Sequence, residues 1–155
     1  MGKTIRISLP NKKVSVVADL VEDLAPKTCK AIWNSLPQEG TATHCKTLGL
    51  QFWTGLKPTD ELRKVPRENY TIYPIPGDLL YGYFPPAWEG GRRGDTEETC
   101  DFVICYGRES PTLGSEGPIL FNHFGVIRGD ISKLAEAGHS LHVKGADKIL
   151  LEKVT

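Results

Sequence analysis

The sequence Glu-Asn-Tyr-Thr-Ile-Tyr-Pro-Ile-Pro-Gly-Asp-Leu-Leu-Tyr-Gly-Tyr occupies residues 68–83 and joins a polar turn to an apolar strand. Pro74 and Pro76 each fix φ and lack a backbone donor, so the approach to the strand is extended and not helical. Gly77 and Asp78 then permit a tight turn before an aromatic-rich strand. Two interpretations stay open: a stiffened connection that enters a barrel strand, or an aromatic wall of a ligand groove built from Tyr81, Tyr83, Phe84 and Trp88.

Outward from this stretch, apolar residues alternate with polar ones in several short segments. Such period-two alternation is typical of strands with one buried face. Strands are expected at Thr4–Leu9, Val14–Ala18, Phe102–Tyr106 and Ile119–Ile127. The segment from Gly40 to Gly55 predicts two further strands with a kink at Gly49, where a missing side chain allows a bend.

Helical spacing of apolar residues occurs twice. Pro26 begins a helix that ends before Pro37. Asp130 is expected to cap a second helix that ends at Gly138, and the chain then closes with a hairpin around Gly145–Asp147. The charged segments Lys57–Glu68 and Glu89–Asp95 are expected to be loops.

These elements predict a mainly β fold in a single domain over residues 1–155. Closure removes the exposed edges of a sheet, so we expect a closed barrel of about eight strands with two short helices.

Composition excludes several classes of function. Lys plus Arg and Asp plus Glu both number 19, so no net charge attracts nucleic acid or an anionic membrane. The first residues show no signal-peptide pattern and no long apolar run occurs, which favours a cytoplasmic protein. The four cysteines lack metal-ligand spacing and are expected to be reduced thiols, so we expect no metal and no cofactor.

Several motifs resemble a known family. The Pro-Lys-Thr helix start, a strand centred on His44 and the segment Phe124–Gly129 follow one another as in the cyclophilins. Residues 66–77, 105–107 and 122–124 look like the signature of a functionally unassigned prokaryotic family of cyclophilin-like proteins. The resemblance covers most of the chain from about Ala25 onward and implies a cyclophilin-like barrel.

The same resemblance argues against prolyl isomerisation. Cyclophilin catalysis depends on an arginine directly after a histidine, and Cys45 stands at that position here. A thiol does not supply the fixed cationic fork of a guanidinium. Leu50, Gln51 and Trp53 stand where the family has its Phe, Met and Gln.

Candidate site residues come from polar groups in apolar runs. Asn122 and His123 lie within a buried strand, where an amide and an imidazole need partners; they either orient a ligand or bridge loop carbonyls. We assign His123 and Tyr106 as candidate catalytic residues. The candidate ligand-binding residues are His44, Trp53, Tyr83, Arg92 and Asn122.

Three hypotheses for function follow. The first is binding, with or without transformation, of a small polar amide- or carboxylate-bearing metabolite in a cleft on the barrel face. The second is a peptidyl-prolyl isomerase with an atypical site. The third is a non-enzymatic interaction or oligomerisation module.

Overall fold

The computed structural model describes residues 2–46, 49–86, 97–114 and 117–155. The strands are β1 (Thr4–Leu9), β2 (Val14–Leu20), β3 (Gln38–His44), β4 (Gln51–Leu56), β5 (Tyr70–Thr71), β6 (Asp78–Phe84), β7 (Thr99–Cys105), β8 (Leu113–Gly114), β9 (Gly117–Pro118), β10 (Phe121–Ile127) and β11 (Asp147–Lys153). The helices are α1 (Pro26–Ser35), α2 (Asp60–Arg63) and α3 (Ser132–Lys144), with a 3-10 turn, η1, at Pro10–Lys12.

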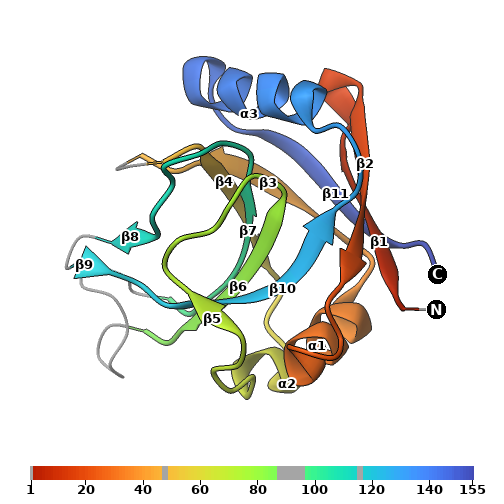
Figure 1. Ribbon diagram of the computed structural model, residues 1–155, viewed down its shortest axis with the longest axis vertical. Helices are drawn as coiled ribbons and strands as arrows, with labels where there is room; N and C mark the ends of the chain where they lie inside the picture. Colours follow the sequence, from red (N-terminus) through yellow and green to blue (C-terminus); the bar gives the residue numbers. More distant parts are fainter. Residues whose placement is uncertain (1, 47–48, 87–96, 115–116) are drawn as a thin grey trace.

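Eight antiparallel strands form a closed barrel in the order β2-β1-β11-β3-β4-β7-β6-β10, and β10 returns to pair with β2. The short strand β5 pairs with β10 outside this circuit, and β8 and β9 form a separate small hairpin (Figure 1). Closure leaves none of the eight strands with an unpaired edge along its full length. The predicted mainly β, closed barrel is therefore confirmed.

Helices cover the two ends of the barrel (Figure 1). The helix α3 lies across one end, while α1 and α2 lie at the other, and both chain termini lie side by side along the barrel wall. Inward-facing residues of the strands and the buried faces of the helices form one interior core, whose largest fully buried side chains include Tyr81, Phe52, Phe102 and Phe124. Among the described residues, no helix has the length and apolarity needed to span a bilayer.

Two helix predictions need correction. The described residues hold three helices, not two, because Thr59 caps a short helix within the charged segment that was predicted to be a loop: its Oγ1 accepts a hydrogen bond from the Leu62 amide. The final helix continues past Gly138 to Lys144, so residues 141–143 are helical and not a strand.

Gly138 is in the middle of α3 for a packing reason. A Cβ built on Gly138 would lie 2.6 Å from Cε1 of Tyr106, so only glycine lets the helix approach this ring. The glycine that was predicted to end the helix instead seats α3 on the barrel.

Candidate functional site

One row of side chains crosses the outer wall of the barrel. Trp53 on β4 pairs with Val103 on β7, Val103 with Leu80 on β6, and Leu80 with His123 on β10. Directly opposed residues of antiparallel strands point to the same face of a sheet. Trp53 and His123, both predicted as site residues, therefore share the outer wall. They are separated by three strand spacings, about 14 Å.

The middle of this row is apolar. Leu80, Val103 and Phe121 form a buried cluster that is separate from the interior core, and we call it the outer cluster. Partly exposed Trp53, Phe84 and Ile119 pack against it. Apolar surface at the border of such a cluster is available to an apolar group of a ligand.

His123 lies at one end of the row and pairs with a carboxylate. Its Nε2 lies 3.2 Å from Oδ1 of Asp78 and 3.1 Å from the carbonyl oxygen of Gly125. The other oxygen of Asp78 accepts a hydrogen bond from the Ile75 amide at 2.9 Å. The His123 side chain is 21% exposed and that of Asp78 is 11% exposed. The pair is thus an oriented imidazole at the surface, backed by a nearly buried carboxylate.

Asp78 controls the charge of this imidazole. The hydrogen bond from His123 to Asp78 raises the pKa of His123, while burial opposes the rise. Asp78 thus stabilises the protonated form of the ring, which is the form that attracts an anionic ligand.

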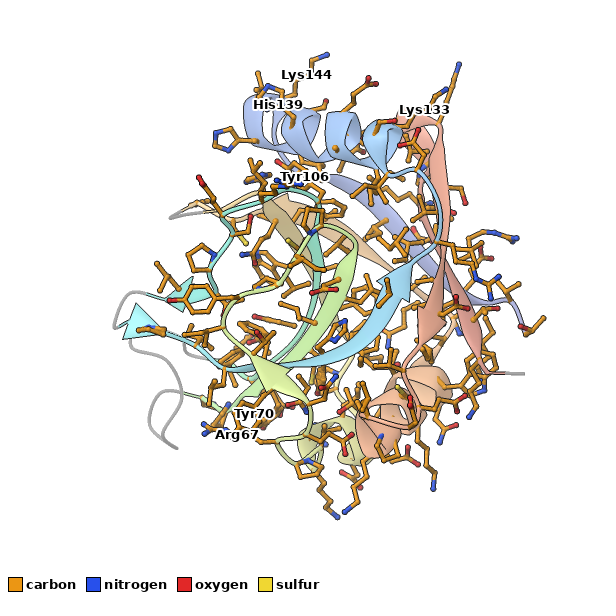
Figure 2. All side chains as sticks on the ribbon, viewed as in Figure 1. Arg67, Tyr70, Tyr106, Lys133, His139 and Lys144 are labelled. Atoms are coloured by element: carbon orange, nitrogen blue, oxygen red, sulfur yellow. The ribbon has the colours of Figure 1, made fainter. Side chains whose placement is uncertain are left out.

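His44 and Tyr106, also predicted as site residues, meet in the interior at the barrel end that α3 covers, and Figure 2 shows Tyr106 beneath this helix. The Nδ1–H of His44 donates to the Cys45 carbonyl at 2.7 Å, so Nε2 accepts from the Tyr106 hydroxyl at 2.6 Å. Both side chains are more than nine-tenths buried. The ring of His142 on α3 lies against His44, with 4.6 Å between centroids. This pair joins the helix to the barrel.

We expect the His44 pair to make the fold sensitive to acid. Burial lowers the pKa of His44, and His142 and His139 lower it further, whereas its bond to the Cys45 carbonyl opposes this. A lowered folded-state pKa gives stability that is present above the unfolded value of about 6.5 and is lost as pH falls below it.

Urea unfolding at a series of pH values between 7.5 and 5 should therefore show falling stability. His44→Gln should flatten this dependence, and His139→Gln, at an exposed position on α3, serves as the milder control. An identical pH dependence in wild type and His44→Gln would contradict the assignment.

Asn122 is fully occupied by protein partners. Its amide donates to Oγ1 of Thr28 at 3.0 Å and to the Pro66 carbonyl at 2.7 Å, and its oxygen accepts from the Glu68 amide at 3.2 Å. The Glu68 carboxylate in turn accepts from the amide and hydroxyl of Thr28 in the first turn of α1. This geometry places Asn122 as a link between α1 and the loop before β5.

The other predicted residues lie elsewhere. Tyr83 packs against the interior core and donates to Oε2 of Glu98 at 2.8 Å; Glu98 also pairs with Arg63 of α2. The hydrogen bond from Arg63 is the largest cause that lowers the pKa of Glu98, to about 2. Arg92 lies outside the described residues. No cluster of three metal-ligating side chains occurs in the part of the chain that the structure describes.

The six predicted residues in the described part of the chain thus do not lie together at one place. The structure brings together His44 with Tyr106, and it places Trp53 and His123 in one row, while Tyr83 and Asn122 lie at separate positions at the α1 and α2 end of the barrel. Sequence reasoning missed Asp78, which was interpreted only as a turn residue. Asp78 precedes Leu80 by two residues, and alternate residues of a strand point to the same face, so the sequence could have placed the Asp78 carboxylate on the face of Leu80.

The family model described as a protein of unknown function, DUF3830, matches residues 7–153. The chain belongs to this family. A search among curated proteins gives no sequence match.

Solved structures show that this DUF3830 chain has a cyclophilin-like fold. McbB in complex with tryptophan is similar over 97% of this chain and 46% of its own, with a TM-score of 0.72 and 16% identity. The hypothetical protein AF2241 from Archaeoglobus fulgidus matches 99% of this chain and 95% of its own, with a TM-score of 0.58 and 19% identity. A cyclophilin-type peptidyl-prolyl cis-trans isomerase of Cryptosporidium parvum matches 100% of this chain and 99% of its own, with a TM-score of 0.52 and 15% identity.

The resemblance seen in the sequence is therefore confirmed for the fold. The DUF3830 chain spans less than half of McbB. Sequence identities below 20% show a shared architecture and do not show a shared activity.

Proposed function

We propose that this protein binds a small carboxylate-bearing metabolite with an apolar body on the outer wall formed by β4, β7, β6 and β10. One observation carries the proposal: the Asp78–His123 pair occupies the same row as partly exposed Trp53, with only apolar side chains between them.

The chemistry of the row supports an acidic ligand. The protonated ring of His123 attracts a carboxylate, and the buried Asp78 stabilises that protonated ring. An amide group is the weaker alternative, because its oxygen accepts the same hydrogen bond without a charge.

The remainder of the row supports an apolar body of limited size. Trp53 and Ile119 border the outer cluster and offer flat and branched apolar surface. Leu80 and Val103, which lie between His123 and Trp53, are almost fully buried, so the apolar body of the ligand contacts the partly exposed border of the outer cluster and not its centre. An aromatic acid or a small acyl amino acid has an apolar body of this limited size. McbB, a protein of the same fold, has been determined with bound tryptophan, which is a molecule of this class.

A titration calorimetry panel tests the proposal. The probes are L-tryptophan, indole-3-carboxylate and phenylacetate, with indole and indole-3-carboxamide as uncharged controls. At least one acid should bind more tightly than its uncharged control. His123→Gln should weaken that binding by about 10- to 100-fold, the usual value of a charged hydrogen bond.

His139→Gln is the matched control, because this exposed histidine lies on α3 at the other end of the barrel (Figure 2). Equal binding by wild type and His123→Gln would contradict the proposal, as would a complete lack of binding by all three acids.

A further inference from the structure

Asn69 holds His123 from the side opposite to Asp78. The amide of His123 donates to the Asn69 carbonyl at 3.0 Å, and Nδ2 of Asn69 donates to the His123 carbonyl at 2.9 Å. The same Nδ2 lies 3.3 Å from Nδ1 of the His123 ring. Asn69 belongs to the segment between Arg67 and Tyr70, which lies towards the α2 end of the barrel (Figure 2).

These contacts fix the orientation of the Asn69 amide. A backbone carbonyl only accepts hydrogen bonds, so the group that faces the His123 carbonyl must be the NH₂ and not the oxygen. The side chain therefore also presents an N–H to the ring nitrogen. Asn69 has φ of 45°, a left-handed conformation that asparagine tolerates better than most residues.

The ring must then carry its proton on the other nitrogen. The neighbours of Nε2, Asp78 and the Gly125 carbonyl, are both acceptors, so Nε2 bears a hydrogen. Nδ1 is the basic nitrogen, and it faces a donor. When Nδ1 is protonated, two N–H groups point at each other and the Asn69 amide has to move away.

We propose that Asn69 is a positioning residue that keeps Nδ1 of His123 unprotonated until an acidic ligand displaces the Asn69 amide. The ligand carboxylate then accepts a hydrogen bond from Nδ1–H, and the proton comes from the solvent. Asp78 favours protonation and Asn69 opposes it; in the described part of the chain these two side chains and the Gly125 carbonyl are the polar groups in contact with the ring. Binding is thus coupled to uptake of one proton. This inference rests on the proposed function.

Two variants of Asn69 and one control variant distinguish an effect of the Asn69 amide on His123 from an effect on the backbone conformation. Asn69→Gly removes the amide and keeps the left-handed backbone without strain. Lys13→Gly is the matched control, because Lys13 is an exposed residue with φ of 55° at the distant η1 turn. Asn69→Asp replaces the donor with an acceptor at nearly the same size.

Long-range ¹H–¹⁵N NMR spectra of the imidazoles test the free protein without any ligand. Wild type should show His123 as the Nε2–H tautomer. Asn69→Gly should raise the pKa of His123, Asn69→Asp should raise it further, and Lys13→Gly should leave it unchanged. An Nδ1–H tautomer in wild type, or the same His123 pKa in wild type and Asn69→Gly, overturns the proposal.

Calorimetry with indole-3-carboxylate at pH 7.5, in two buffers with different ionisation enthalpies, tests the coupling. Wild type should take up a proton on binding. Asn69→Gly should take up less and bind about 2- to 10-fold more tightly, because no hydrogen bond has to be broken. Asn69→Asp should bind more weakly, since it repels the carboxylate.

Equal proton uptake by wild type and Asn69→Gly overturns the coupling. If none of the acids binds, the proposed function fails, and the NMR comparison still decides whether Asn69 controls the proton on His123.

Discussion

Asn122→Ala is expected to lower the free energy of unfolding by about 2–4 kcal/mol, because it removes the hydrogen bonds of Asn122 to the hydroxyl of buried Thr28, the Pro66 carbonyl and the Glu68 amide. Asn122 is 7% exposed, so water replaces these hydrogen bonds poorly. Urea denaturation monitored by tryptophan fluorescence measures the change.

Asn34→Ala is the matched control for this truncation. The amide of Asn34 also pairs with a glutamate, Glu61, but it lies on the exposed surface of α1. Its loss should change stability by no more than about 0.5 kcal/mol. If Asn122→Ala is as stable as wild type and instead loses affinity for the acids, Asn122 is a ligand-binding residue and not a link to α1.

Tyr106→Ala is expected to lower the free energy of unfolding by about 3–5 kcal/mol, since removal of a buried aromatic ring leaves a cavity between α3 and the barrel. Gly138 packs directly on this ring, and the hydroxyl donates to His44. Tyr106→Phe keeps the ring and leaves only Nε2 of His44 without its donor, so a smaller loss of about 1–3 kcal/mol is expected.

The ligand panel distinguishes a structural Tyr106 from a catalytic or binding one. The hydroxyl of Tyr106 lies beneath α3, and we expect Tyr106→Phe to bind the acids with wild-type affinity. A stable Tyr106→Phe variant with tenfold weaker binding would move the site to the α3 end of the barrel.

The barrel was predictable from sequence because its signal is local. Alternation such as Ile5, Ile7 and Leu9 specifies a strand with one buried face, and the number of such strands favours closure. The end of α3 was not predictable from sequence, because a glycine after an apolar helical stripe predicts the end of a helix. Only the contact of Gly138 with the ring of Tyr106, which the structure shows, explains why a glycine lies within the helix.

The candidate site was less predictable because register between distant strands creates it. His123 was recognised as a polar residue in an apolar strand, but its partners come from β6 and from the segment before β5. A β-bulge between His123 and Gly125 also sets which residues of β10 face outwards. Strand periodicity alone does not specify such pairings.

The most direct test of the outer-wall site is an NMR titration of ¹⁵N-labelled protein with indole-3-carboxylate. It follows the imidazole signals of His123 and His44 together with the indole N–H of Trp53. We expect the signals of His123 and Trp53 to shift together and saturate at the same ligand concentration, while those of His44 stay in place. Saturable shifts confined to His44, or no shift at His123 when the ligand binds, would contradict a carboxylate site on the outer wall of the barrel.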